Sequence, residues 1–148
     1  MVSISKDIRG SDYAKLIAEA CRRYARFSLV WRDQLEFDAA ALSLKKELKR
    51  FETSRAHTDT WPGTRLIGHK ADVITYSIAA AATGVLLRPG SLFGWLTPRF
   101  PEDLAFYTAD GSCAIETIAH ESDAIFHDDD LLPLLPPGAK PKLAKGTQ

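Results

Sequence analysis

The densest group of side chains that could carry chemistry lies near the C-terminal end of the chain. It consists of two histidines and five carboxylates: His120, Glu121, Asp123, His127, Asp128, Asp129 and Asp130. Imidazole and carboxylate together suit Mn, Fe or Zn, whereas carboxylates alone suit Mg or Ca. Alanine stands at position 124, where an HExxH motif needs its second histidine. Two interpretations follow: a small metal-dependent enzyme that uses His120, Glu121 and Asp123, or a solvated acidic turn at the end of a hairpin.

A second carboxylate pair, Glu102 and Asp103, follows a proline and precedes an apolar run. Such a pair could act as a general acid and base, or cap a turn through local backbone hydrogen bonds. No serine lies in a nucleophile elbow, and the glycines at 84, 90 and 94 are too far apart to cradle a phosphate. We therefore expect no catalytic residue, no metal and no cofactor.

Charge is distributed unevenly along this chain of 148 residues, although its formal net charge is zero. Residues 100–130 contain nine Asp or Glu and no Lys or Arg, whereas residues 1–55 contain 12 basic and 8 acidic residues. Such asymmetry can steer a charged partner. We predict that the acidic region binds a protein partner with a basic surface. The predicted contact residues are Glu102, Asp103, Glu121, Asp123, Asp128, Asp129 and Asp130.

Nucleic acid is the alternative partner that the basic residues suggest. Two predicted helices carry side chains that could contact phosphates: Arg22, Arg23, Lys45, Lys46, Lys49 and Arg50. The chain is not basic overall, however, and the adjacent acidic segment would repel nucleic acid. A protein partner is therefore favoured over nucleic acid.

The periodicity of apolar residues predicts the elements that position these groups. Helices are expected at 12–24, at 34–52 with Asp33 as its cap, and at 79–87. Strands are expected at 26–32, 71–78, 104–107, 113–118 and 124–127, with a hairpin turn at Asp110-Gly111 and a polar loop over 53–63.

These elements predict an α+β fold with a mixed or antiparallel sheet of about four to five strands and two to three helices packed on it. Residues 1–130 form a single domain in this prediction. Residues 131–148, rich in proline, leucine and lysine, are expected to be a flexible tail.

Cysteine usage and hydropathy indicate the compartment. Cys21 and Cys113 are too few for a disulfide scaffold, and no apolar stretch approaches the roughly 18–20 residues that span a bilayer. The N-terminus has no apolar segment of the kind found in secretory signals. We therefore predict a cytoplasmic protein with no membrane partner.

Three segments, WPGT at 61–64, PEDLAFY at 101–107 and AHESDA at 119–124, occur together in this order and spacing. Over about residues 25–127 the chain resembles a family of small uncharacterised bacterial proteins that carry these segments. That family has no established activity, so the resemblance implies a bacterial source and supplies no catalytic residue. By analogy, we expect a non-enzymatic protein-binding or regulatory module, such as an immunity protein or an accessory subunit of a toxin or defence system.

Overall fold

The structure is a computed structural model that describes residues 1–137 and the backbone of residues 142–143. Its strands are β1 (Val2–Ile4), β2 (Arg26–Arg32), β3 (Glu52–Thr58), β4 (Thr60–Trp61), β5 (Thr64–Arg65), β6 (Ala71–Ser77), β7 (Glu102–Tyr107), β8 (Cys113–Ile118), β9 (Asp123–Phe126) and β10 (Lys142–Leu143). The α-helices are α1 (Gly10–Arg23), α2 (Ala39–Leu48) and α3 (Ala80–Leu86). Short 3-10 turns are η1 (Lys49–Phe51), η2 (Leu92–Gly94), η3 (Ala119–Glu121) and η4 (Asp129–Leu134).

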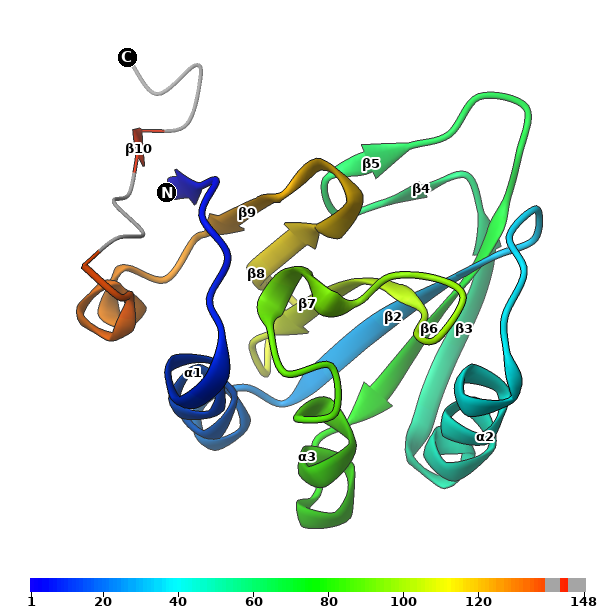
Figure 1. Ribbon diagram of the computed structural model, residues 1–148, viewed down its shortest axis with the longest axis horizontal. Helices are drawn as coiled ribbons and strands as arrows, with labels where there is room; N and C mark the ends of the chain where they lie inside the picture. The colour runs from blue at the N-terminus through cyan, green and yellow to red at the C-terminus, as the bar shows by residue number, and fades with distance from the viewer. Residues whose placement is uncertain (138–141, 144–148) are drawn as a thin grey trace.

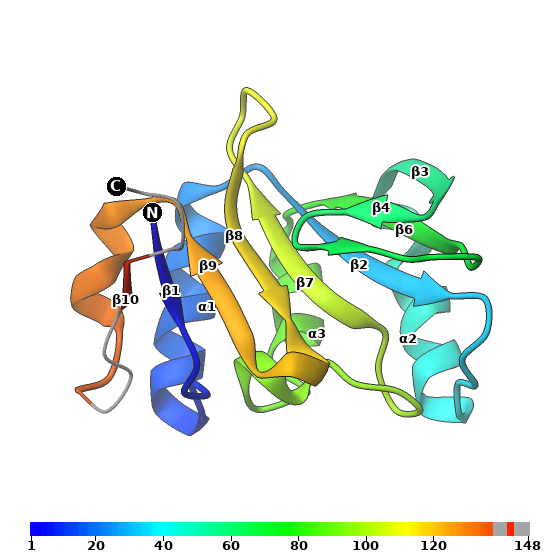
Figure 2. The same cartoon turned by 90° about the horizontal axis from the view of Figure 1, so that it is seen from above.

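Eight of the strands form one antiparallel sheet in the order β10-β1-β9-β8-β7-β2-β6-β3. The three α-helices lie side by side on one face, with α3 between α1 and α2 (Figures 1 and 2). The short hairpin of β4 and β5 lies on the opposite face (Figure 1). The sheet is therefore covered by helices on one side and only in part on the other.

The core on the helix side is organised around the central strand β2. Its aromatic and aliphatic residues alternate with other side chains, so that every second residue points toward the helices. Phe27 stacks on Tyr76 of β6 with ring centroids 5.1 Å apart and contacts Phe106 of β7 at 6.4 Å. All three rings are buried. Strands β6, β2 and β7 are therefore joined by side-chain packing as well as by backbone hydrogen bonds.

Helix α1 is fixed to α3 through a buried hydroxyl. The Tyr13 hydroxyl donates a hydrogen bond to the carbonyl of Leu86 at 2.6 Å and accepts one from the indole N–H of Trp95 at 3.0 Å. Tyr13 and Trp95 are almost completely buried. One side chain thus connects α1, the end of α3 and the segment after η2.

The predicted α+β class is confirmed, but the predicted count of four to five strands is wrong. The missed strands are β1 in the N-terminal segment, β3 and β4 in the expected polar loop, β5 directly after that loop, and β10 in the expected tail. β3 pairs only with β6, and five consecutive residues within it are exposed. An edge strand of this kind has no buried face to impose the alternation of apolar residues that sequence reasoning detects.

Helix α2 begins five residues later than the predicted start at residue 34. Asp38, rather than Asp33, is its cap, because the Asp38 carboxylate accepts a hydrogen bond from the amide of Ala41 at 3.0 Å. Asp33 instead lies 3.3 Å from the Nε2 atom of His57 on β3. The shorter helix and η1 place Lys45, Lys46 and Lys49 beside the edge of the sheet.

The fold also extends beyond the predicted boundary at residue 131. η4 continues to Leu134, and Leu131 is fully buried within the main core. The remainder of the predicted flexible tail, at 138–141 and 144–148, lies outside the described residues. Among the residues that are described, no helix has both the length and the apolar character needed to cross a membrane.

Replacing Tyr13 by phenylalanine tests the buried connection between α1 and α3. The substitution leaves the Leu86 carbonyl and the Trp95 indole without their partner, so we expect the free energy of unfolding to fall by about 1–3 kcal/mol. Urea denaturation measures this change. The control is Tyr76→Phe, which removes a buried hydroxyl that has no hydrogen-bond partner in the described part of the chain. An equal loss in both variants would contradict the interpretation.

Candidate functional site

The structure separates the seven acidic residues predicted to bind a partner. Glu102 and Asp103 on β7 are only 5% and 2% exposed. They cannot present their carboxylates to a basic protein surface, so the prediction of a partner contact is wrong for these two residues. Their burial has a physical cause, because the hairpin of β4 and β5 and the side chain of Arg32 cover this end of β7.

Asp103 joins three segments of the chain through its carboxylate. One oxygen accepts a hydrogen bond from the indole N–H of Trp61 at 2.9 Å, and the other accepts one from the amide of Ala119 at 3.1 Å. The residue has φ +54°, in the left-handed region that aspartate enters more readily than most residues. Asp103 therefore ties the hairpin and η3 to β7.

Glu102 forms a buried ion pair with Arg32 of β2. The Arg32 Nε atom lies 3.1 Å from a carboxylate oxygen of Glu102, and the guanidinium lies over the Trp61 ring at 5.6 Å from its centroid. Burial raises the pKa of both carboxyls; the charge of Arg32 opposes the rise at Glu102, and the hydrogen bonds from Trp61 and Ala119 oppose it at Asp103. The attraction between the two charges offsets part of the cost of burying them, and the Trp61 ring holds the guanidinium in position.

The metal-ligating set that the structure assembles differs from the predicted one. His120 lies with Glu102 and Asp103, and the potential ligand atoms of these three residues are within 4.8 Å of one another. Across residues 1–137 this is the single such set: Glu121 lies 4.0 Å from His120, but the predicted set of His120, Glu121 and Asp123 is not assembled. Both oxygens of Asp103 already accept hydrogen bonds, and Arg32 supplies positive charge to Glu102. These contacts fit a structural cluster.

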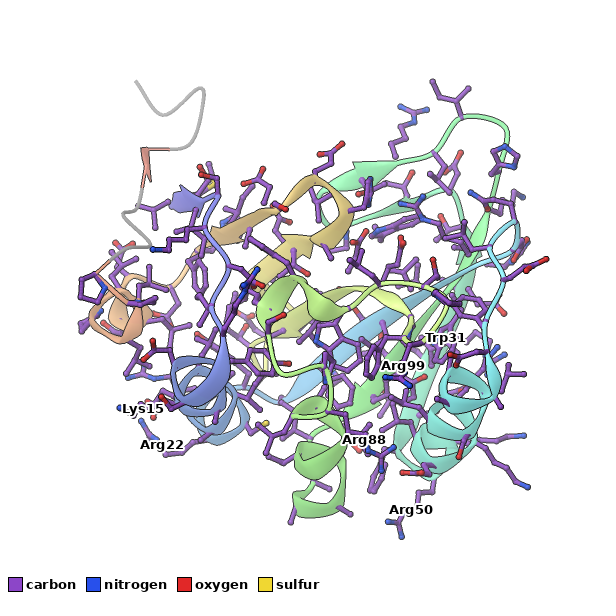
Figure 3. The ribbon with its side chains drawn as sticks, viewed as in Figure 1. Lys15, Arg22, Trp31, Arg50, Arg88 and Arg99 are labelled. Carbon is purple, nitrogen blue, oxygen red and sulfur yellow. The ribbon has the colours of Figure 1, made fainter. Side chains whose placement is uncertain are left out.

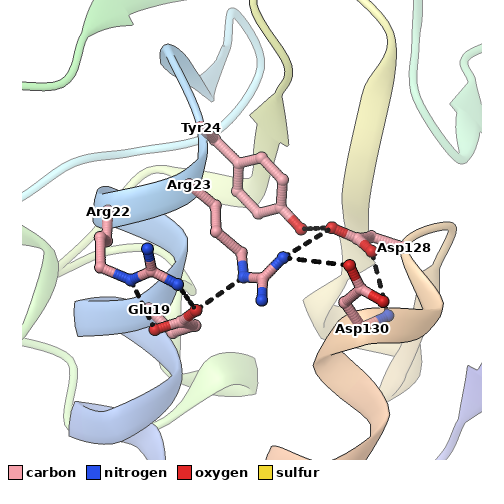
Figure 4. A network of polar contacts seen from close by, with 6 residues as sticks. All are labelled: Glu19, Arg22, Arg23, Tyr24, Asp128 and Asp130. Carbon is pink, nitrogen blue, oxygen red and sulfur yellow. Dashed lines mark hydrogen bonds and ion pairs between the residues drawn. The ribbon is translucent and has the colours of Figure 1, made fainter.

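The acidic residues after β9 form a network with α1 (Figure 4). Arg23 lies 3.3 Å from a carboxylate oxygen of Asp130 and 3.9 Å from one of Asp128, and it also pairs with Glu19 at 2.6 Å. The Tyr24 hydroxyl donates to Asp128 at 2.7 Å. Asp128 in turn caps η4 by accepting from the amide of Asp130. These carboxylates hold η4 against α1.

Three of the predicted contact residues lie outside this network, although Glu121 is 4.0 Å from His120 and Asp129 is 3.9 Å from the N-terminal ammonium. The side chains of Glu121 and Asp129 are 63% and 74% exposed. Asp123 is half-buried at the start of β9. The acidic surface is therefore much smaller than the run of nine acidic residues suggests, and its binding to a basic partner stays a prediction.

The basic residues of α1 and α2 do not form one surface. Arg22 and Arg23 both pair with Glu19. Helix α3 lies between α1 and α2 (Figure 1), and Figure 3 shows Lys15 and Arg22 on one side of the molecule and Arg50 near α2 on the other. The nucleic-acid surface predicted from both helices together is therefore not assembled.

The α2 side instead contains a hollow between α2 and strands β3 and β6, with a volume of about 340 Å³. We call it the basic hollow. Its lining consists of Leu42, Lys45, Lys46, Lys49, Glu52, Arg55, Ile74 and Tyr76. Four of these residues are cations and one is a carboxylate. That carboxylate, Glu52, pairs with Arg55 at 2.8 Å, which leaves the three lysines in excess.

Tyr76, which lines the hollow, has a buried hydroxyl that makes no hydrogen bond of acceptable geometry in the described residues, and the same holds for the buried indole N–H of Trp31, which does not line the hollow. Tyr76 lines the hollow and is 1% exposed. The Lys45 ammonium lies 5.0 Å from the centroid of the Trp31 ring. Burial raises the pKa of Tyr76 to about 12, with the indole of Trp31 opposing the rise, so the hydroxyl is a protonated donor at neutral pH. No hydrogen bond of acceptable geometry joins the two groups.

The hollow borders the edge strand β3. This strand pairs with β6 on one side and with no other described strand on its second side. It has seven residues and starts with Glu52, which lines the hollow together with Arg55. Sequence reasoning found the lysines of α2 but assigned β3 to a loop, so it could not place these groups together.

Comparison with known proteins supplies no function for this chain. No family model, curated protein or solved structure matches it. The resemblance of the three short segments to small bacterial proteins therefore stays a prediction.

The pH dependence of stability tests the buried ion pair. Burial raises the pKa of Glu102 above its usual value of 4.5, so the native chain binds this proton more tightly than the unfolded chain. The group therefore makes the free energy of unfolding fall as pH rises from 4.5 toward neutrality. In Glu102→Gln this contribution is absent, so we expect the free energy of unfolding to fall less steeply across this pH range. Urea denaturation at several pH values measures the change.

Glu47→Gln is the control for this measurement. Glu47 is exposed, and its ion pair with Arg88 lowers its pKa, so it makes stability rise with pH. Glu47→Gln should therefore make the free energy of unfolding fall slightly more steeply as pH rises. A Glu102→Gln profile as steep as that of the wild type would contradict the interpretation.

Proposed function

We propose that this protein is a binding module that holds an acidic, extended segment of a protein partner along β3 and over the basic hollow. One observation carries the proposal: an exposed seven-residue edge strand runs beside a hollow lined by four cations. The proposal keeps the binding class expected from the sequence. It moves the contact surface from the acidic region to the opposite edge of the sheet.

The free edge supports pairing with an added strand. An edge strand presents a row of backbone N–H and C=O groups, and extended segments of other proteins can add to such a row. Charged residues on an edge also hinder unspecific pairing. Arg55 on β3 pairs with Glu52 and Asp72, so the lysines beside the edge are the charges that would repel basic segments and favour acidic ones.

Charge complementarity supports the acidic character of the partner. No ion pair joins the three lysines of the hollow or Arg50 to an acidic side chain in the described chain, and the one carboxylate of the lining, Glu52, pairs with Arg55. Side chains alternate across a strand, so every second residue of an added segment would lie over the hollow. Electrostatic attraction of this kind speeds association and selects the partner.

We keep an immunity protein or an accessory subunit of a toxin or defence system as the hypothesis for the biological role. Its support is the resemblance of the three segments 61–64, 101–107 and 119–124 to small bacterial proteins. In such a role the acidic segment would belong to the protein that this chain restrains or assists.

A model peptide tests the docking mode directly. We expect a seven-residue peptide that alternates threonine and glutamate to bind the full chain, measured by fluorescence anisotropy. Lys45→Glu/Lys49→Glu should weaken binding at least tenfold, because two attractions become repulsions. The matched control, Lys15→Glu, reverses an exposed lysine on α1 and should leave affinity unchanged.

Backbone methylation separates strand pairing from simple charge attraction. Methylating alternate amides of the peptide blocks pairing along one of its edges, and we expect one of the two methylation patterns to abolish binding. Equal binding of both methylated forms would contradict edge pairing. Equal binding by a peptide with lysine in place of glutamate would contradict the acidic partner.

A further inference from the structure

We infer that the partner segment bound along β3 is charge-polarised: it runs antiparallel to β3, with acidic residues in its C-terminal half and a basic residue near its N-terminal end. The inference rests on the proposed function, because it takes β3 and the basic hollow as the docking surface. It adds the direction of the partner segment and the order of its charges.

The two halves of β3 have different neighbours on the face that carries α2. Arg55 lies opposite the buried Ile74 of β6, and His57 lies opposite Asp72, so both side chains point to the helix face. Glu52 and Arg55 line the basic hollow, whereas His57 is not part of its lining. The hollow therefore adjoins the first half of β3, and His57 belongs to the second half.

The first half of β3 lies beside positive charge. Lys49 is in η1, which ends directly before β3 begins, and Lys45 and Lys46 lie about one turn back along α2. All three lysines line the hollow, and no ion pair joins them to an acidic side chain of the described chain. A strand added to the edge would meet this positive charge beside the start of β3, where acidic side chains are favoured.

The second half of β3 lies beside negative charge. The Nδ1 atom of His57 is 3.0 Å from Asp72, and its Nε2 atom is 3.3 Å from Asp33, which follows β2 in the segment that leads to α2 (Figure 1). Arg55 also approaches Asp72, at 3.7 Å, but Glu52 at 2.8 Å already offsets its charge. Two carboxylates thus face one imidazole, which carries at most one positive charge. This end of the edge would repel an acidic side chain and attract a basic one.

Antiparallel pairing sets the order of charges along the partner. Every described strand pair of the main sheet is antiparallel, and antiparallel ladders are slightly more stable per residue than parallel ones. The C-terminal half of an antiparallel segment lies beside the start of β3 and the lysines, and its N-terminal end lies beside His57 and Asp33. A segment with the opposite order of charges would be repelled at both ends, which gives selectivity.

Two seven-residue peptides of identical composition test the order of charges. The matched peptide has lysine first, glutamate fifth and seventh, and threonine elsewhere; the second peptide has the reversed sequence. We expect the matched peptide to bind the full chain about tenfold more tightly in fluorescence anisotropy at low ionic strength, because reversal turns several surface attractions of about 0.2–1 kcal/mol each into repulsions. Added salt should reduce the difference.

A nitroxide label at the N-terminus of the matched peptide reports its direction. In ¹H–¹⁵N spectra of the full chain, we expect the strongest broadening at the backbone amides of His57 and Thr58, at the end of β3. The strongest broadening at Lys49 and Glu52 instead would overturn the antiparallel direction.

Asp33→Asn tests the negative end of the edge. The substitution removes one of the two carboxylates beside His57, so we expect the preference for the matched over the reversed peptide to fall about threefold. The matched control is Asp129→Asn, which removes an exposed carboxylate on η4 and should leave the preference unchanged. An unchanged preference in Asp33→Asn would contradict the role of this carboxylate in selecting the order of charges.

The outcomes separate this inference from the proposed function. Equal or tighter binding of the reversed peptide would overturn the inference, and the docking proposal would stand if Lys45→Glu/Lys49→Glu still weakens the binding of the peptide that alternates threonine and glutamate. If none of the three peptides binds, both the inference and the docking proposal are overturned. Tighter binding of the matched peptide, together with the strongest broadening at His57 and Thr58, would establish the polarity of the partner.

Discussion

The structure depends on the burial of β2 on both of its faces. The five central residues of this strand are buried, and strict alternation sends Trp31 toward the helices and Arg32 toward the hairpin of β4 and β5. Two neighbouring residues thus set the polar chemistry of two different regions. The Trp31 ring lies 5.0 Å from the Lys45 ammonium of α2, and Arg32 brings a positive charge to the buried carboxylates of β7.

The polar groups of the two regions differ in how far the chain itself neutralises them. Around Glu102 and Asp103, the cation and the hydrogen-bond donors come from the chain itself, so the cluster holds the hairpin and η3 in place. At the hollow, four cations outnumber the one carboxylate of the lining. The first arrangement is compensated within the fold, whereas the second leaves an excess of positive charge at the surface.

Sequence reasoning recovered the elements whose pattern is imposed by burial. Alternating apolar residues gave β2 and β6, and the turn at Asp110-Gly111 gave the hairpin of β7 and β8. β3 was missed because its exposed residues carry no such pattern, and the hollow depends on β3. The burial of Glu102 and Asp103 could not be predicted either, because their partners Arg32 and Trp61 are distant in sequence.

The same partners explain why the acidic run is a poor guide to the binding surface. Its carboxylates are drawn into internal contacts with Arg32, Arg23, Tyr24 and Trp61, which fix the hairpin and η4. The lysines of the hollow have no comparable internal partners, because the one carboxylate in its lining, Glu52, pairs with Arg55. A chain of zero net charge therefore presents positive charge at one edge. The positive charge that no internal ion pair neutralises is the charge that stays available to a binding partner.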